Sequence, residues 1–471
     1  MEQYTARAAA FPAKRFFVEM LTRDIELTDA ILDLLDNCVD GAMRRRAASE
    51  SMADAGRPYE GCWAHIDFSE SGFSIEDNCG GIPIEIAKRS AFRMGRADPM
   101  LDIDLPTVGV YGIGMKRALF KLGAHCVVES QTAEDSFSLA ITPEWMGSDT
   151  EWELDLIVGA GQLATPGTRI TVTSLRDGIA QMLATENLTY RDELDKAISA
   201  YYGYIIEKGF EVVVNTRSIE PQRVSLLVDQ SALDGTRSGI APYVYETDID
   251  GVSVSLTVGM YRDLPTNEED EAASQGKPST ERAGWTVICN DRVVLHADKT
   301  RMTGWGEAGV PAYHTQFVSI SGVIEFRSAS AAKLPITTTK RGIDGNSDLY
   351  LSVKEFMREG LKTFTDYTNR WKQKTLAREE VVLNAKPVLA GAAREMIPTA
   401  KWSRVNKPAG GRKYRPSLPM PAESDPLKWM RFAKKTSDIE LVASYLFDDR
   451  SCEPSVVAEK CFSDVLRKLA S

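Results

Sequence analysis

The chain has no run of about 18 uninterrupted apolar residues, so we expect no membrane-spanning helix. Its first twenty residues include Arg7, Lys14 and Arg15 and lack the apolar stretch of a secretory signal. We therefore expect a cytoplasmic protein with no membrane partner. Of its 471 residues, 43% are hydrophobic and 26% are charged, which excludes a mainly disordered or collagen-like chain.

Residues for disulfide or zinc chemistry are few and scattered. The seven cysteines form no C-x-x-C pair, and none of the four histidines lies within a few residues of another. We therefore expect reduced thiols and neither a disulfide framework nor a zinc site.

An excess of basic charge is also lacking, because the net charge is −11. This excludes a strongly basic coat for nucleic acid, although a local basic patch is compatible with it. A length of 471 residues suggests roughly three units. The pattern of helix and strand signals predicts an α+β protein. We divide it into an α/β domain at 1–180, a second α/β domain at 181–380, a basic linker containing Pro and Gly at 381–425, and a small helical segment at 426–471.

Hydrophobic spacing predicts three features of the second half. Residues 347–380 have apolar side chains at helical spacing and are expected to form a long helix. Strand signals dominate 203–330, where residues 285–295 predict a hairpin with an Asn290-Asp291 turn. Residues 264–282 contain an acidic cluster and little to bury, so we expect an exposed loop.

Residues 24–42 predict an amphipathic helix with an acidic arc. Its apolar side chains share one broad face, and Asp33, Asp36, Asn37 and Asp40 gather opposite to them. Three carboxylates without an interleaved Lys or Arg repel one another, and a cation such as Mg²⁺, which favours oxygen ligands, would relieve that repulsion. A solvated face of an ordinary helix is the alternative. As a site, Asp33 or Asp36 could polarise a water for attack on a phosphate.

A second candidate is the segment Ile-Glu-Asp-Asn-Cys-Gly-Gly-Ile-Pro at 75–83, after a strand signal. Taken alone it is an ordinary turn, because Asn, Asp and Gly are turn formers. As a site, a buried carboxylate at Asp77 would accept a hydrogen bond from an exocyclic amine such as that of adenine. The glycines would let the ring lie against the backbone.

A third candidate is the series of glycines at positions 109, 112 and 114, just before a helix signal. Such glycines can present backbone N–H groups to phosphates, and Lys116 would neutralise phosphate charge. The series is not a Walker A loop, because Met115 separates the last glycine from the lysine. Nor is it a Rossmann fingerprint, whose glycine order differs.

A fourth segment, Gly167-Thr168 before a β-branched strand, is informative only through its place after the other three. In this order, D-L-L-D-N-x-x-D-G-A, D-N-C-G-G-I, G-x-x-G-x-G-x-K and G-T resemble the GHKL ATPase superfamily. Its members include gyrase B, heat-shock ninety-type chaperones, histidine kinases, MutL and MORC proteins. The resemblance covers residues 15–180. It implies an N-terminal Bergerat α/β sandwich that binds and hydrolyses ATP with Mg²⁺.

The resemblance also implies roles for individual residues. Asn37 would be the Mg²⁺ ligand, Asp77 would bind the adenine amine, and Thr168 would support Asp77 through a hydrogen bond. Asp33 stands where the family has its general-base Glu. It is shorter by one methylene, roughly 1.5 Å of reach, so hydrolysis is slow unless the helix lies closer to the phosphate. The other implied ATP-binding residues are Asp40, Gly81, Ile82, Gly109, Gly112, Gly114, Met115 and Lys116.

Residues 330–341 resemble the loop of a transducer domain. In gyrase, MutL and MORC relatives this domain follows the ATPase domain and sends a Lys to the γ-phosphate, where it stabilises charge on the transferred phosphoryl group. We expect Lys340 to be that lysine, with Lys333 as the alternative. For either residue singly, a solvated basic loop is an equal explanation. With its transducer-like second half, the chain is closest in style to MORC- and MutL-like proteins.

The implied function is an ATP-driven switch. ATP and Mg²⁺ would close a lid near residues 94–116, and two protomers would dimerise through their N-terminal segments. Lys340 would then reach the phosphate, and hydrolysis would reopen the clamp. The alternatives are a chaperone-like ATPase that acts on protein clients and a non-hydrolysing, nucleotide-gated interaction module.

The partner of such a clamp is suggested only by composition. Basic residues in 401–425 point to a polyanion such as DNA, in its maintenance or in defence, whereas a solvated linker is the more ordinary explanation. The C-terminal segment is a candidate contact for a protein partner. The basic residues are Lys401, Arg404, Lys407, Arg412, Lys413 and Arg415.

Overall fold

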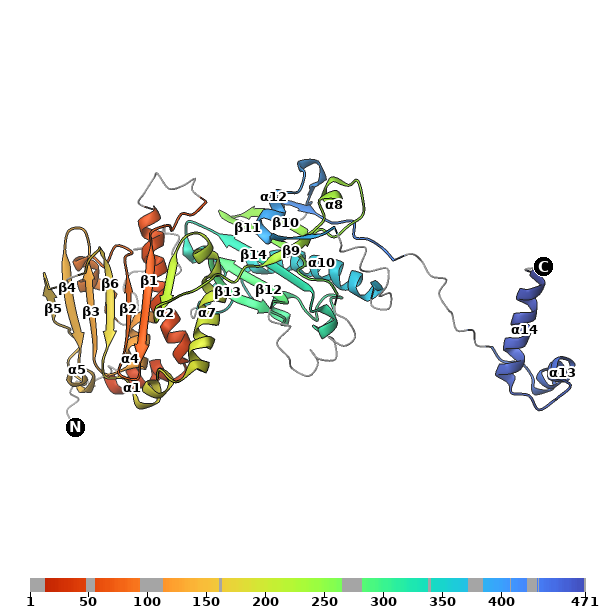
Figure 1. Cartoon of the computed structure of the whole chain (residues 1–471), viewed down its shortest axis with the longest axis horizontal. Helices are drawn as coiled ribbons and strands as arrows, with labels where there is room; N and C mark the ends of the chain where they lie inside the picture. Colours follow the sequence, from red (N-terminus) through yellow and green to blue (C-terminus); the bar gives the residue numbers. More distant parts are fainter. Residues whose placement is uncertain are drawn as a thin grey trace, which may run out of the picture. The chain divides into compact units, whose positions relative to one another are not determined.

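A computed structural model describes residues 13–47, 56–93, 113–160, 163–264, 282–337, 340–371, 384–406, 408–421, 430 and 432–469. They belong to two compact units, Met1–Met420 and Pro421–Ser471. The larger unit contains two sheets of eight and seven strands, each with helices packed against it (Figure 1). The smaller unit is helical, and the α+β class predicted from the sequence is confirmed.

The first sheet has the strand order β5-β4-β3-β6-β2-β1-β7-β8. Its neighbouring strands are antiparallel except for β1 and β7, which run parallel. The strands are β1 (Trp63–Ser69), β2 (Gly72–Asp77), β3 (Cys126–Gln131), β4 (Ser136–Ile141), β5 (Leu156–Val158), β6 (Gly167–Val172), β7 (Glu211–Val214) and β8 (Arg217–Ser218).

One face of this sheet is packed. In β2 and β3 buried and half-buried residues alternate, as expected when one face covers a core. Helices α1, α2, α4 and α7 lie along the packed side (Figure 1). Their bounds are α1 (Lys14–Arg23), α2 (Leu27–Ala47), α4 (Gly114–Leu122) and α7 (Leu188–Glu207), with shorter helical segments α3 (Ile84–Ile86), η2 (Ala87–Ala91), α5 (Pro143–Gly147) and α6 (Asp177–Met182).

The first sheet continues beyond the boundary predicted at residue 180. Helix α7 follows, and β7 then pairs with β1. Parallel strands need a long crossover connection, and α7 lies in that connection. The strand signal at 211–214, assigned from the sequence to the second domain, therefore belongs to the first sheet, which ends at Ser218 in β8.

The second sheet has the strand order β13-β12-β14-β11-β10-β17-β16. Its strands are β10 (Tyr243–Ile249), β11 (Val252–Met260), β12 (Gly284–Cys289), β13 (Arg292–Asp298), β14 (Ile320–Arg327), β16 (Ser403–Arg404) and β17 (Arg412–Tyr414). A separate pair joins β9 (Ser225–Val228) to β15 (Lys386–Leu389). The remaining short segments are α8 (Gln230–Asp234), η3 (Arg301–Thr303), η4 (Thr315–Phe317), η5 (Ala331–Lys333), α12 (Ala390–Glu395) and η6 (Thr399–Lys401).

The predicted hairpin and long helix are both present in this second part. Strands β12 and β13 pair antiparallel around Asn290 and Asp291, whose φ angles of 46° and 67° suit a tight two-residue turn. Helix α10 (Asp348–Trp371) packs on the sheet, where the ring of Phe356 stacks on Tyr245 at 3.7 Å. The predicted helix end at 372–380 and most of the predicted acidic loop, at 265–281, lie outside the described residues.

The segment predicted to be a linker is instead part of the fold where it is described. Residues 384–406 and 408–421 contribute β15, α12, β16 and β17, and β17 pairs with β10. Tyr414 and Ala393 are buried, which explains why a segment rich in basic residues, Pro and Gly is ordered. The strand partners of this segment lie far away in the sequence, so no local pattern predicts the pairing.

The smaller unit contains α13 (Thr436–Phe447) and α14 (Pro454–Leu469), which pack on each other. They confirm the predicted helical C-terminal segment. Among the described residues, no helix is both long enough and apolar enough to cross a bilayer.

Candidate active site

Helix α2 brings three of the predicted site residues to one place. Asp33 and Asp40 are each 4% exposed, although they lie on the polar arc of the helix. Asn37 is exposed between them, and its Nδ2 donates a hydrogen bond to the backbone oxygen of Asp33 at 3.0 Å. Asp29 in the first turn and arginines in the last turn suit the helix dipole. The acidic arc is therefore enclosed, and the alternative of a solvated face is wrong.

The end of β2 supplies a second wall. Asp77 is 8% exposed, and its Oδ1 accepts a hydrogen bond from the backbone N–H of Cys79 at 2.7 Å. Thr168 is the register partner of Asp77 on β6. The hydroxyl of Thr168 lies 3.2 Å from that of Ser130, and the backbone of Thr168 is what helps to hold the charged form of Asp77. The hydrogen bond implied by the resemblance thus comes from the main chain.

Gly81 follows Asp77 with a φ of 74°, and it lies against the backbone of β3. A Cβ atom at this position would lie 2.2 Å from the carbonyl oxygen of Gln131, which is far inside a contact distance. Gly80 has a φ of 103°, but a Cβ there would meet nothing within 4 Å. The turn therefore requires Gly81 for space as well as for its backbone angle.

We predict that Gly81→Ala lowers the free energy of unfolding by at least about 3 kcal/mol, since it adds a steric clash to backbone strain. Gly80→Ala is the matched control and should cost only about 1–2 kcal/mol, from its left-handed backbone alone. Urea unfolding of both variants measures the difference. Equal losses would show that the close approach to Gln131 is unimportant.

Helix α4 contributes residues from the glycine motif. Gly114 begins the helix, and a Cβ there would lie 3.4 Å from Oδ2 of Asp33, so α4 and α2 approach closely. Lys116 is 3% exposed and its Nζ donates to the backbone oxygen of Ala91 at 2.8 Å. Burial lowers the pKa of Lys116 to about 8. Gly109 and Gly112, and with them most of the predicted lid at 94–116, lie outside the described residues.

Lys340 reaches the same place from the second domain. Its Nζ lies 3.5 Å from Oδ2 of Asp36 and 4.0 Å from Oδ2 of Asp40. Burial by itself would lower the pKa of Lys340, but the carboxylates of Asp36, Asp40 and Asp33 outweigh it and raise that pKa. Lys333, the alternative, points elsewhere and donates to the backbone oxygen of Asp250. The geometry therefore favours Lys340 for the expected role.

These elements enclose a cavity of about 680 Å³, which is within the usual range for a small-molecule site. Its lining combines apolar side chains, such as Ile75 and Ile82, with charged side chains from α2 and α4. The predicted residues that line it are Asp33, Asn37, Asp40, Asp77, Gly81, Ile82, Gly114, Met115, Lys116, Thr168 and Lys340. Motifs separated by about 300 residues in the sequence thus meet at one site.

Residues 25–162 match the family described as histidine kinase-, DNA gyrase B-, and HSP90-like ATPase. Residues 25–162 of the N-terminal domain are thus similar to GHKL-type ATPase domains. The match covers α2, β2 and α4, which form most of the cavity wall, and it ends before β6 and the second sheet. No curated protein matches the chain significantly.

The sequence leaves open whether Asp33 or Asp36 polarises the attacking water, and the structure distinguishes between them. Asp33 lines the cavity of the GHKL domain, whereas Asp36 does not. Burial, followed by the negative charge of Asp36, raises the pKa of Asp33, and an ion pair with Arg117 opposes this rise. The Arg117 Nη2 to Asp33 Oδ2 distance is 2.6 Å. A carboxylate with a raised pKa is a stronger base, so Asp33 is the better candidate.

The side-chain oxygen of Asn37 is the candidate magnesium ligand of this domain. Because Nδ2 of Asn37 is used within α2, the side-chain oxygen of Asn37 is the atom that a cation would use. The carboxylates of Asp33 and Asp40 lie one turn away on either side and line the same cavity. Hard oxygen donors of this kind suit Mg²⁺.

Asp77 has a pKa raised to about 6 because it is buried, and hydrogen bonds from the Cys79 and Thr168 backbone oppose the shift only in part. Protonation removes the charge that strengthens its acceptance of an amine hydrogen bond. We predict that adenine-nucleotide affinity falls as the pH falls through about 6. The ratio of wild-type to Asp77→Asn affinity, measured by calorimetry from pH 5 to 8, isolates this titration from that of the nucleotide. A constant ratio would contradict the prediction.

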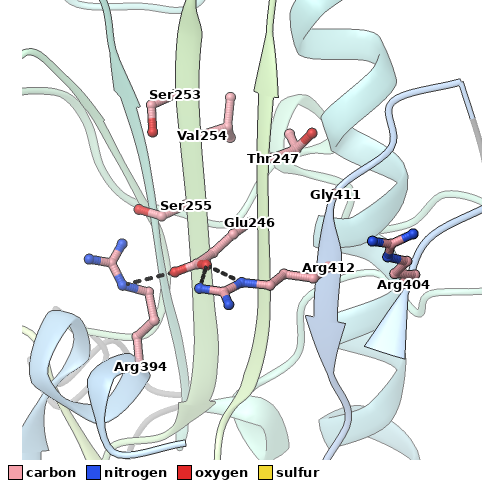
Figure 2. A pocket seen from close by; sticks show the side chains of 9 residues that line it. All are labelled: Glu246, Thr247, Ser253, Val254, Ser255, Arg394, Arg404, Gly411 and Arg412. Atoms are coloured by element: carbon pink, nitrogen blue, oxygen red, sulfur yellow. Dashed lines mark hydrogen bonds and ion pairs between the residues drawn. The ribbon is translucent and has the colours of Figure 1, made fainter. Parts of the chain in front are cut away.

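The predicted polyanion-binding residues do not form one exposed basic surface. On β17, Arg412 and Lys413 point to opposite faces, as neighbours on a strand must. Figure 2 shows Glu246 between Arg412 and Arg394, with Arg412 Nη2 at 2.7 Å and Arg394 Nε at 3.2 Å from its carboxylate oxygens. Lys413 pairs with Glu359 at 2.7 Å.

The other predicted basic residues lie at different places. Arg404 is the register partner of Arg412 across β16 and β17, and both line the hollow beside Glu246 (Figure 2). Lys401 is exposed, and Arg415 is exposed beside a different hollow near Arg370. Lys407 lies outside the described residues. The pairing of β16 with β17 therefore brings two of the arginines together, whereas Lys413 points to the other face and Arg415 lines another hollow.

Three residues near the site were missed in the sequence. Arg117 follows Lys116 directly, and its place in the first turn of α4, beside α2, is the signal that could have found it. Tyr202 and Arg292 both contact Asp36, at 2.7 Å in each case. They are 166 and 256 residues from it, so no local pattern could reveal these contacts.

Proposed function

We propose that the protein is a Mg²⁺-dependent ATPase in which Asp33 activates the attacking water and Lys340 contacts the terminal phosphate. The observation that carries this proposal is the convergence of Asp33, Asn37, Asp77 and Lys340 on one cavity. GHKL ATPase domains bind and hydrolyse ATP, so the family match supports the same activity class.

The cavity has a division of roles that suits this reaction. Asp77 accepts a hydrogen bond from the adenine amine, and Gly81 lets the base lie against the backbone. Asp33, on α2, holds the position of a general base. Lys116 and Lys340 supply positive charge for the phosphates, and a cation at Asn37 would orient them and neutralise charge during transfer. The short side chain of Asp33 is consistent with slow hydrolysis.

We further propose that nucleotide binding changes the association of two protomers and the relation of the two sheets. Lys340 belongs to the second domain but lines a cavity of the first, so nucleotide in the cavity acts on both. Closure as a clamp, similar to MORC- and MutL-like proteins, is the expected consequence, with DNA as the candidate client. The ion pairs of Arg412 and Lys413 with glutamates give this client less support than the sequence did.

Two other functions are compatible with a GHKL domain. A chaperone-like ATPase would prevent aggregation of protein clients. A non-hydrolysing module would bind ATP tightly and release no phosphate, and the shortened Asp33 is the feature that favours it. The C-terminal helices, with Leu441 and Tyr445 exposed, are a candidate contact for a protein partner.

Two measurements together test the proposal. One is a phosphate-release assay with and without DNA, and the other is the molecular mass of the protein in the presence of a non-hydrolysable ATP analogue. We expect Mg²⁺-dependent release and a doubling of mass with the analogue. Binding without release would favour the non-hydrolysing module. A rate of phosphate release that DNA does not change, together with no binding of DNA by the protein, would reject DNA as the client.

A further inference from the structure

A fully buried arginine from the second domain contacts the nucleotide-site helix. Arg292, the first residue of β13, has a side chain that is 0% exposed. Its Nε donates to Oδ1 of Asp36 at 2.7 Å, and its guanidinium lies 4.1 Å from the ring centre of Tyr202. The hydroxyl of Tyr202 lies 2.7 Å from the same Oδ1 and 2.7 Å from the backbone oxygen of Leu32, and its one proton is shared between these two acceptors. Asp36 is therefore held firmly on one side.

The other oxygen of Asp36 is much less well satisfied. Among the described residues, Oδ2 is buried and has no hydrogen-bond partner. Lys340 Nζ lies 3.5 Å from it, which is too long for a good hydrogen bond. One carboxylate thus faces two cations of the second domain. Arg292 is bonded to it, and Lys340 is only near it.

This difference bears on what Lys340 can do. A buried carboxylate is costly unless it is paired, so Asp36 needs one cation at all times. With Arg292 in that role, Lys340 can move from Asp36 to a phosphate without leaving the buried carboxylate of Asp36 unpaired. If Arg292 were neutral, Lys340 would be the nearest cation that could pair with Asp36, and leaving it would be penalised.

We propose that Arg292 is a positioning residue that acts through Lys340: it is the permanent counter-ion of Asp36 and thereby leaves Lys340 available to a terminal phosphate. This inference rests on the proposed function of Lys340. It assigns a separate role to Arg292, which does not line the cavity.

The test compares the affinities of the full chain for a non-hydrolysable ATP analogue and for ADP, both with Mg²⁺, by calorimetry. Only the analogue has the phosphate that Lys340 would contact. Arg292→Gln should lower the preference for the analogue about tenfold, within the range of couplings between neighbouring charges, and leave ADP affinity unchanged. Adding Asp36→Asn should restore the preference to within about twofold, because it removes the carboxylate that lies nearest to Lys340.

A purely structural role for Arg292 predicts a different result. The double variant would then be at least as impaired as Arg292→Gln, since a further buried hydrogen-bonding group is altered. An unchanged preference in Arg292→Gln, or a failure of Asp36→Asn to rescue it, overturns the proposal. If Arg292→Gln does not fold, the single variant Asp36→Asn tests the proposal. The proposal predicts that Asp36→Asn keeps the preference for the analogue over ADP, and loss of that preference contradicts it.

Lys340→Met separates this inference from the function on which it rests. It should abolish the preference for the analogue. If it does not, the proposed role of Lys340 fails, and the role of Arg292 fails with it. If Lys340→Met abolishes the preference but Arg292→Gln keeps it, only the inference about Arg292 is wrong.

Discussion

Asp33→Asn should reduce steady-state ATP turnover at least about a hundredfold, the lower part of the range for loss of a general base. Nucleotide affinity should change little, because the amide keeps the size of the side chain and the adenine end of the cavity is untouched. Phosphate release and calorimetric affinity, measured on the same preparation, check both parts of the prediction. Asp33→Ala should have the same effect on turnover.

Glu26→Gln is the matched control for Asp33→Asn. It makes the same chemical change at an exposed residue that immediately precedes α2 and does not line the cavity. Its turnover should equal that of the unmodified chain. Full turnover in Asp33→Asn would remove Asp33 from the mechanism, and equal losses in both variants would indicate a general effect on α2.

Asp77→Ala should weaken binding of ATP and ADP about 10- to 100-fold. A hydrogen bond to a charged group contributes about 1.5–3 kcal/mol, and in the variant the adenine amine would lose its acceptor. The loss should be similar for both nucleotides, because the proposed contact of Asp77 is with the adenine, which ATP and ADP share. Calorimetry with each nucleotide measures this, and thermal unfolding establishes that the variant is folded.

Glu76→Gln is the control for Asp77→Ala because the neighbouring side chain on β2 points to the other face of the sheet. Glu76 pairs there with Arg169 at 2.7 Å and does not line the cavity. It should leave nucleotide affinity unchanged. If Asp77→Ala bound both nucleotides normally, the base would have to bind elsewhere.

The positions of the residues within each motif could be predicted because these residues lie close together along the chain. Asp33 and Asn37 are one helical turn apart, so a periodic pattern is enough to place them together on α2. Asp77 ends a strand and precedes glycines, and that order predicts its position at a sheet end. The meeting of α2, β2 and α4 at one cavity came from the family resemblance rather than from spacing.

Features that depend on distant parts of the chain could not be predicted. The acidic arc of α2 is buried because α4, α7 and the second domain cover it, and nothing within residues 24–42 encodes those neighbours. The pairing of Asp36 with Arg292 spans 256 positions. Strands β16 and β17 join the second sheet because β17 pairs with β10. In each case long-range packing overrides what local composition indicates.

Calorimetric titration of the full chain with a non-hydrolysable ATP analogue and Mg²⁺ tests the central claim most directly. If the cavity between α2, β2, α4 and Lys340 is a nucleotide site, binding should saturate at one nucleotide per chain and weaken at least tenfold in Asp77→Ala. The account is contradicted if no binding heat is measured and competition with a fluorescent nucleotide also shows no binding. Equal affinity in Asp77→Ala would contradict it as well.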